Sequence, residues 1–507
     1  MCVGDVCYAG RAMAYPLLAL YMLLIAACDS STGGDSSAIG SEADAGEHTD
    51  DAGAATSHDA GPPPETGTER MQASRLFSID PNTLPFDAIA GSKVETDRYW
   101  GVLDGAGYRI EVPKEWNGYL VMYAHGYVGS VPALRAATPP IRRHLIEHGY
   151  AWAASSYSAN YYDVRAGIED TNKLALAWKR LVGDNGRSVT EPSKRYLIGH
   201  SMGGHITGAA IEKEAGSTAN NKVSYKGAVP MCGVMGDTQL FNYFGAFQAA
   251  AQKLSGVPAT SEFASIRMQV QNALFTMYPA ATTPAGDKLK AVVRNLTGGA
   301  RPLFEAGFAT KGLQDAVWST FGGDGTIDGI LVKRVVDTEA IVYQLDDDPA
   351  QSAEEKAFNA DVERVKADRD ANALRKDGLR YIPQVNGDFN IPIVSLHTLG
   401  DLYVPFWMEQ LYRKRAMDKG SNDWLVQRAI RGTRHCEFTY LEQTEAFDAM
   451  INWEQNGIKP EGDDVLDAKL LRDPNYGCKF TRNSFAPEDM TASSTIMAAR
   501  AAVPACP

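Results

Sequence analysis

The sequence predicts an α/β fold: a mostly parallel, doubly wound sheet with a helical cap inserted before one of its last strands. Three observations predict it. Short apolar runs alternate with helix-like segments, as in parallel strands joined by crossover helices. Residues 237–388 break that alternation and read as a series of helices. Residues 199–204 form a Gly-rich turn between an apolar run and a helix-like segment.

The strands are expected where apolar and β-branched residues cluster in short runs. They cover residues 97–103, 107–112, 119–124, 150–155, 194–199, 226–232, 391–397 and 424–430. Helices are expected between the later strands, at residues 164–181, 202–215, 405–419 and 439–454. Because helices alternate with these strands, the later strands run parallel in a doubly wound sheet.

The run Gly-His-Ser-Met-Gly-Gly at residues 199–204 matches the G-x-S-x-G nucleophile elbow. In that motif a sharp turn from strand to helix exposes the serine hydroxyl. Gly199 and Gly203 fit this reading, because a Cβ atom at either place would press into neighbouring backbone. Ser201 is therefore the expected nucleophile, and the alternative is a Gly-rich turn with a capping serine.

A serine on such an elbow needs an acid and then a histidine, each on a loop after a later strand. Asp401 follows the strand at 391–397, and His435 follows the strand at 424–430. We therefore expect Asp401 to be the acid and His435 the base. The alternatives are that Asp401 only caps the helix after Pro405 and that His435 is a surface histidine.

Three other histidines compete for the role of base. His397 precedes the acid and lies within a strand, so the chain order disfavours it. His200 and His205 flank the serine on the elbow, where they are expected to pack around the turn rather than take its proton.

The oxyanion of an acyl-transfer reaction needs backbone N–H donors that are fixed in advance. The first expected donor is Met202, directly after the serine. The second is Tyr127, on the loop after the strand at 119–124, where Gly126 permits the turn. The alternative is that His125 and Gly126 merely end a strand.

These motifs give the chain a resemblance to the α/β-hydrolase superfamily over roughly residues 95–460. The resemblance rests on G-H-S-M-G-G at 199–204, H-G-Y at 125–127, G-D-x-x-V-P at 400–405 and H-C-x-F at 435–438. More narrowly, the chain resembles a group of secreted microbial esterases and prolyl-oligopeptidase-like enzymes with a long insertion before the acid strand. The resemblance implies the α/β-hydrolase fold and no particular substrate.

Two residues depart from related patterns. Arg434 stands where a glycine often precedes the histidine. Cys436 matches a cysteine that tannases and feruloyl esterases place after the histidine, but His200 occupies the place of its partner before the nucleophile. The chain is therefore not expected to belong to the tannase and feruloyl esterase family.

The cap, residues 237–388, lies where a lid covers the serine, excludes water and shapes a pocket. Its helices are expected near residues 241–254, 261–277, 284–296, 303–321 and 352–368. Its aromatic residues either line that pocket or, more commonly, form the cap's own core: Phe241, Tyr243, Phe244, Phe247, Phe275 and Tyr278. The Gly-rich run 322–329 is expected to be a turn, since it lacks the alternating ligands of a calcium loop.

The first 28 residues are expected to be a signal peptide, because Arg11 precedes a short apolar stretch. That stretch ends in Leu-Ile-Ala-Ala-Cys, which resembles a bacterial lipobox with Cys28 as the lipidated residue. The alternative is plain secretion after cleavage near Ala27. Residues 29–75 are expected to be a disordered tether, since they hold almost nothing that packs.

The net charge of −13 is concentrated in that tether, where residues 29–70 hold ten acidic residues and one arginine. The rest of the chain therefore carries only −4. No basic patch with interleaved aromatic residues is present, which excludes nucleic acid as an expected partner.

Four cysteines follow Cys28: Cys232, Cys436, Cys478 and Cys506. An even number in an exported chain predicts two disulfides, and sequence allows three pairings. We favour Cys478 with Cys506, and Cys232 with Cys436, because Cys232 ends a strand at the sheet edge that carries the histidine loop. The alternative is that these are buried free thiols.

The predicted units are the signal peptide (1–28), tether (29–75), first part of the core (76–236), cap (237–388), second part of the core (389–460) and C-terminal extension (461–507). The predicted function is hydrolysis of a small or polymeric carboxylic ester through an acyl-enzyme, with no metal or organic cofactor. The alternatives are a prolyl-oligopeptidase-like serine peptidase and a surface lipoprotein that binds a ligand without turnover. The expected location is the bacterial cell envelope or the exterior.

Overall fold

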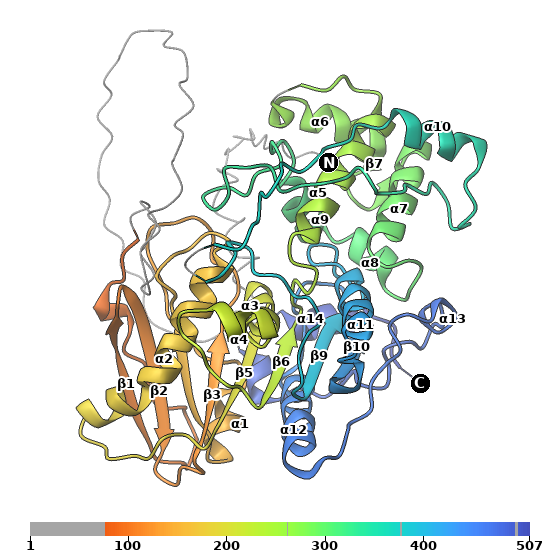
Figure 1. Ribbon diagram of the computed structural model, residues 1–507. Coiled ribbons are helices and arrows are strands. Elements are labelled where there is room, and N and C mark those ends of the chain that lie inside the picture. Colours follow the sequence, from red (N-terminus) through yellow and green to blue (C-terminus); the bar gives the residue numbers. More distant parts are fainter. Residues whose placement is uncertain (1–76, 261, 376–377, 492–494, 507) are drawn as a thin grey trace, which may run out of the picture.

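The computed structural model describes residues 77–260, 262–375, 378–491 and 495–506 (Figure 1). The predicted signal peptide, the lipidation candidate Cys28 and the tether lie outside the described residues. Among the helices that are described, none combines the length and apolar character of a membrane crossing.

Among the described residues, eight strands form the main sheet, in the order β1-β2-β4-β3-β5-β6-β9-β10. They are β1 (Thr96–Leu103), β2 (Ala106–Pro113), β3 (Tyr119–Ala124), β4 (Ala151–Ser155), β5 (Lys194–His200), β6 (Gly227–Met231), β9 (Ile393–Thr398) and β10 (Leu425–Ile430). β2 pairs antiparallel with β1 and β4, and the strands from β4 to β10 run parallel. All the predicted strands are present, and the α/β-hydrolase fold is confirmed.

Side chains alternate across the sheet, so each face has its own core. Leu120 and Met122 of β3 pack with α2 (Val164–Asp184), α3 (Met202–Ala210) and α11 (Trp407–Lys419). Val121 and Tyr123 of the same strand pack with α1 (Arg142–Glu147) and α12 (Tyr440–Asn456) on the other face. Helices thus cover both faces, as a doubly wound sheet requires.

The helix predicted at 202–215 is wrong as a single element. It divides into α3 and α4 (Lys213–Thr218). At the break, the buried Glu212 carboxylate accepts hydrogen bonds from the backbone N–H groups of Gly387 and Asp388, both at 2.9 Å. This contact ties the corner to a segment far along the chain, which helix periodicity does not reveal.

The cap forms a layer of helices above the sheet in Figure 1. Its elements are α5 (Gln239–Ser255), α6 (Phe263–Leu274), β7 (Phe275–Met277), β8 (Ala281–Thr282), α7 (Pro284–Leu296), α8 (Phe304–Phe308), α9 (Lys311–Trp318) and α10 (Ala353–Asp361). The predicted helix 261–277 ends early in the β7–β8 hairpin, and the predicted helix 303–321 is two helices that meet at residues 309–310. The last predicted helix, 352–368, ends at Asp361.

Most of the cap's aromatic residues form its own core, as the simpler expectation has it. Tyr243, Phe247 and Phe275 are buried there together with Trp318. Three of the cap's aromatic residues also contact the core. The Tyr243 hydroxyl donates to the Leu402 carbonyl oxygen at 2.9 Å, and the rings of Phe241 and Phe244 lie against aromatic rings of the core. The run at 322–329 forms turns, as expected.

After α12 the chain continues as the C-terminal extension. It contains α13 (Ala468–Leu471), the 3-10 helix η4 (Pro487–Met490) and α14 (Ile496–Ala501). The predicted disulfide between Cys478 and Cys506 is confirmed, and it closes most of this segment on itself.

Candidate active site

Ser201 lies between β5 and α3 with backbone angles of φ 57° and ψ −120°, a strained conformation for a residue with a side chain. The neighbouring glycines make the turn sterically feasible. A Cβ atom on Gly199 would lie 2.3 Å from the carbonyl oxygen of Gly203, and one on Gly203 would lie 2.0 Å from that of Ala124. The chain therefore adopts the sharp strand-to-helix turn expected of a nucleophile elbow.

The structure brings together the three side chains that sequence reasoning selected. His435 Nε2 lies 2.8 Å from Ser201 Oγ, and His435 Nδ1 lies 2.5 Å from Asp401 Oδ2. Asp401 is fully buried, whereas 17% of the His435 side chain is exposed. The serine hydroxyl is thus linked through an imidazole to a buried carboxylate.

Asp401 is held from its other side by the backbone of its own loop. Its Oδ1 accepts hydrogen bonds from the N–H groups of Tyr403 at 2.9 Å and Val404 at 3.0 Å. The cap residue of α11 is Phe406, so Asp401 does not cap that helix. These bonds fix the carboxylate and leave Oδ2 for His435.

His397 lies behind Asp401 rather than beside the serine. Its Nε2 is 2.8 Å from the Val404 carbonyl oxygen and 3.9 Å from Asp401 Oδ2, and its Nδ1 is 3.5 Å from Glu409 Oε1. Burial lowers the pKa of His397, but the Glu409 carboxylate, and then that of Asp401, outweigh burial and raise it above the usual value. A second buried imidazole therefore lies beside the acid.

His200 and His205 pack around the elbow as expected. His200 Nε2 lies 3.0 Å from Gln443 Oε1, and His205 lies between the Tyr162 hydroxyl at 2.9 Å and the Pro383 carbonyl at 2.7 Å. Burial lowers the pKa of each histidine to about 4. Both rings are therefore neutral at physiological pH.

The predicted disulfide between Cys232 and Cys436 is confirmed, and it lies directly against the reacting groups. Cys232 Sγ is 3.3 Å from the Ser201 backbone nitrogen, and Cys436 Sγ is 3.4 Å from His435 Nε2. These two cysteines and His435 form a cluster of metal-ligand types, but the sulfur atoms are bonded to each other. The disulfide ties the histidine loop to the end of β6.

The loop expected to supply the second oxyanion donor lies beside the serine. A Cβ atom on Gly126 would be 3.3 Å from Ser201 Cβ, so the backbone passes close to it. The Tyr157 hydroxyl donates to the carbonyl oxygen of His125 at 3.0 Å and holds the loop in place. Met202 is the first residue of α3. The donor roles of Met202 and Tyr127 stay predictions.

Sequence reasoning missed the aromatic residues that join the cap to the site. The Tyr403 ring meets His435 edge to face at 5.7 Å between centroids, and Phe244 of the cap stacks on Tyr403 at 5.7 Å. Phe241 of the cap similarly meets Tyr162 at 5.3 Å. Tyr403 lies inside the G-D-x-x-V-P run, so its position was the available signal.

The cap also supports the turn that carries the acid. Arg301 Nε donates to the Leu399 carbonyl oxygen at 2.7 Å, and a Cβ atom on Gly307 would lie 1.9 Å from the Gly400 carbonyl oxygen. Neither residue belongs to a recognisable motif, so no sequence signal identifies them.

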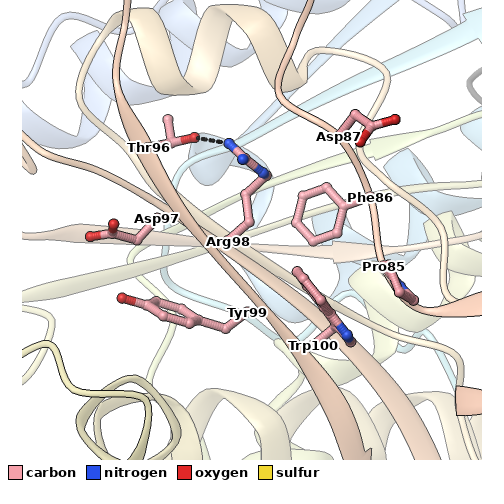
Figure 2. Close-up of a pocket in the computed structure, with 8 residues that line it drawn as sticks. All are labelled: Pro85, Phe86, Asp87, Thr96, Asp97, Arg98, Tyr99 and Trp100. Atoms are coloured by element: carbon pink, nitrogen blue, oxygen red, sulfur yellow. Dashed lines mark hydrogen bonds between the residues drawn. The ribbon is translucent and has the colours of Figure 1, made fainter. Parts of the chain in front are cut away.

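A hollow of about 490 Å³ lies elsewhere on the molecule, and Figure 2 shows the side chains that line it. It is lined by Pro85, Phe86, Asp87, Thr96, Asp97, Arg98, Tyr99 and Trp100. These residues belong to edge strand β1 and a preceding segment. None of them is a hydrogen-bond partner of the Ser201, His435 or Asp401 side chain among the described residues. The hollow is therefore separate from the candidate active site.

No family model matches the chain. A curated relative, an o-phthalyl amidase from Xanthobacter agilis, is 30% identical over 83 residues, which is 16% of this chain and 18% of the amidase. The chain thus matches less than a fifth of that relative's length.

Several solved structures are similar at low identity. Feruloyl esterase B from Aspergillus oryzae has a TM-score of 0.42 at 14% identity, over 73% of this chain and 83% of that chain. A rice cell-wall-degrading esterase from Xanthomonas oryzae has a TM-score of 0.32 at 16% identity, over 69% of this chain and 83% of that chain. Acylaminoacyl peptidase from Pyrococcus horikoshii has a TM-score of 0.36 at 11% identity, over 74% of this chain and 44% of that chain. These likenesses assign no substrate to this chain.

Proposed function

We propose that this chain, which has the α/β-hydrolase fold, is a serine hydrolase that cleaves carboxylic esters through an acyl-enzyme. One observation carries the proposal. His435 lies within hydrogen-bond distance of both the Ser201 hydroxyl and the buried Asp401 carboxylate, at 2.8 Å and 2.5 Å. A nucleophile, a base and an orienting acid in this order can activate a hydroxyl that is inert on its own.

In the proposed reaction, Ser201 Oγ attacks the ester carbonyl while His435 Nε2 takes the hydroxyl proton. The oxyanion that forms accepts hydrogen bonds from the N–H groups of Met202 and Tyr127. The tetrahedral intermediate collapses, the C–O bond to the alcohol breaks, and His435 gives its proton to the leaving alkoxide. Water, deprotonated by the same imidazole, then hydrolyses the acyl-enzyme and restores Ser201.

A second candidate is cleavage of an amide by the same residues. The similarity to an o-phthalyl amidase over 83 residues favours keeping it. The chemistry differs mainly in the leaving group, which must be protonated before the C–N bond breaks. A non-catalytic, ligand-binding lipoprotein is the third candidate.

A comparison of esters with amides tests these candidates. The substrates are p-nitrophenyl esters of graded acyl length and a proline-linked arylamide, each run beside Ser201→Ala. Faster ester cleavage that Ser201→Ala abolishes is the expected result. Faster arylamide cleavage would replace the ester proposal with the peptidase, and failure of a fluorophosphonate to label Ser201 would leave the ligand-binding candidate.

We further propose that the chain works outside the cytoplasm, anchored through Cys28 or secreted. Two disulfides support an oxidising compartment, since such bonds rarely persist among reduced cytosolic thiols. Lipid at Cys28 would add stable membrane association. Replacement of Cys28 by alanine should then move the protein from the membrane fraction to the soluble fraction of its host.

A further inference from the structure

The C-terminal extension, residues 461–507, has no part in the mechanism above, yet its described residues bind the loop that carries His435. We define the histidine loop as residues 431–437. We propose that the extension positions His435, and that Arg500 of α14 is the positioning residue that holds the loop. This inference rests on the proposed function, in which His435 is the base.

Arg500 reaches the histidine loop through Glu437. Its Nη2 donates to the Glu437 carbonyl oxygen at 2.7 Å, and its Nε lies 3.2 Å from Glu437 Oε1. Glu437 in turn accepts hydrogen bonds on Oε2 from the backbone N–H groups of Thr433 at 3.2 Å and Arg434 at 3.0 Å. The residues before and after His435 are therefore joined through one carboxylate, which Arg500 holds.

The same guanidinium also joins the loop to the helix that follows it. Arg500 Nη2 donates to Glu442 Oε2 at 2.8 Å. Glu442 closes the capping box of α12 with Thr439, and its Oε1 accepts from the backbone N–H of Arg482 in the extension at 2.8 Å. The start of α12 and the histidine loop are thus fixed to one cation.

Burial makes this cation necessary. Arg500 is 5% exposed, Glu437 is 7% exposed and Glu442 is 2% exposed. Burial raises the pKa of both carboxyl groups, and the charge of Arg500 counters that rise. Two carboxylates buried together without a cation would have to take up a proton or open to water, because an unpaired buried charge is strongly destabilising. Either response disturbs the loop.

Other residues of the extension hold the same loop. The Arg431 backbone N–H donates to Thr481 Oγ1 at 2.9 Å, and its Nη1 donates to the Pro474 carbonyl at 2.7 Å. Arg434 Nη1 donates to Thr495 Oγ1 at 2.9 Å. The Cys478–Cys506 disulfide encloses Arg500, so the extension is itself held closed. The extension therefore contacts the histidine loop at three places, Arg431, Arg434 and Glu437.

The functional consequence is a matter of small distances. Proton transfer requires His435 Nε2 to stay at hydrogen-bond distance from Ser201, and a displacement of about 1 Å costs on the order of 100-fold in rate. The Cys232–Cys436 disulfide fixes the loop next to His435 on one side. Arg500 fixes it from behind, where the Glu437 backbone and side chain are both bound.

The test compares Arg500→Met with Arg500→Lys in the full chain, with Arg109→Met as a matched control. Arg109 lies on β2, away from the histidine loop, and is a buried arginine with 6% exposure. Its Nε donates to the Leu84 carbonyl oxygen at 2.9 Å. Each variant reacts with a fluorophosphonate under conditions where it is folded. The final amplitude counts competent molecules, and the rate constant reports how well His435 activates Ser201.

We expect Arg500→Met to lower the labelling rate constant and kcat by about 10- to 100-fold, with KM little changed. Arg500→Lys should recover part of the loss, because it restores the cation but not the guanidinium fork. Arg109→Met should keep the rate constant of the native chain even if it unfolds at a lower temperature. A normal rate constant in Arg500→Met, with only a reduced amplitude, would overturn the positioning role.

Hydrogen exchange of the segment 431–438 separates this inference from the proposed function. Faster exchange there in Arg500→Met, and not in Arg109→Met, supports the contact network whether or not the protein is a hydrolase. Unchanged exchange overturns it. If the native chain is not labelled at Ser201, the proposed function fails separately, and Arg500 is then left with no reaction to position.

Discussion

Asp401 illustrates how much a single buried carboxylate depends on its neighbours. It accepts from two backbone N–H groups and from His435, and the His397 ring lies behind it at 3.9 Å. A fully buried carboxylate is costly to fold without such hydrogen-bond partners. His397 also faces Glu409 at 3.5 Å, so one ring serves two buried acids.

This arrangement predicts a pH dependence of stability for His397. Because its folded-state pKa lies above the ordinary value of 6.5, the folded protein holds a proton that the unfolded chain has already lost. The stability that His397 contributes is full below pH 6.5 and is lost as the pH rises through the raised pKa. Urea midpoints of the native chain should therefore fall over that window.

The variant His397→Gln isolates the effect. Its urea midpoint should be lower than that of the native chain at pH 6, and the difference should shrink as the pH rises. A constant difference from pH 6 to pH 9 would contradict the raised pKa. A circular dichroism spectrum like that of the native chain confirms that the variant is folded.

Among the elements, the turn between β5 and α3 has little steric freedom. A Cβ atom on Gly199 or Gly203 would meet backbone atoms of Gly203, Ala124 or His125 at distances that no Cβ atom tolerates, and Gly203 lies against the end of β3. The backbone of Ser201 is strained in the same turn. The elbow therefore depends on β3 and β5 being paired in their observed register.

Gly203→Ala should consequently lower both stability and activity. Its Cβ atom would lie 2.0 Å from the Ala124 carbonyl oxygen, so the turn must shift away from β3. We expect a loss of about 2 kcal/mol or more in unfolding free energy and on the order of 100-fold in kcat. Chemical denaturation and ester hydrolysis measure the two effects.

Gly216→Ala is the matched control, because this glycine lies in α4 and an added Cβ atom would meet nothing within 4 Å. It should keep native activity and gain slightly in stability, since alanine favours the helix. Equal losses in both variants would show that the close contacts of Gly203 do not account for the effect.

The cap is anchored at both of its connections to the core. Asp237, where the chain enters the cap, accepts from the Val385 backbone N–H at 3.2 Å and from Arg415 Nη1 at 2.6 Å. Arg415 also donates to the Val385 carbonyl at 2.7 Å, where the chain returns. The ion pair between Asp237 and Arg415 of α11 thus holds both the start and the end of the cap against the core.

At the scale of the whole molecule, buried titratable groups oppose one another. His200 and His205 have a pKa lowered to about 4, so the unfolded chain binds more protons than the folded one below pH 6.5. Their contribution to stability is therefore lost as the pH falls from 6.5 towards 4. Glu212, whose pKa burial raises to about 7, acts in the other direction between pH 4.5 and 7.

Each of the two buried histidines should cost the protein stability as the pH falls below about 6.5, because unfolding frees it to take up a proton. His205→Gln should make the dependence shallower, since it removes one of the groups that must be charged on unfolding. Urea midpoints measured from pH 7 to pH 4 check this expectation. A dependence in His205→Gln as steep as that of the native chain would contradict the account.

Local patterns sufficed for the parts of this chain where neighbouring residues dictate the backbone. Apolar runs placed the strands within two residues, and the Gly-x-Ser-x-Gly turn placed Ser201. Chain order selected Asp401 and His435 because parallel strands end at the same edge of the sheet. The same argument paired Cys232 with Cys436.

Only the tertiary structure decided what stands behind those residues. Arg500 meets Glu437 and Glu442 across 63 and 58 residues, and Glu212 meets the end of the cap across 175. Phe244 and Arg301 of the cap contact the loop that carries Asp401, and neither residue belongs to a sequence motif. Such contacts depend on how elements pack after they form, and sequence periodicity carries no information on that packing because many partners would satisfy the same apolar face or buried charge.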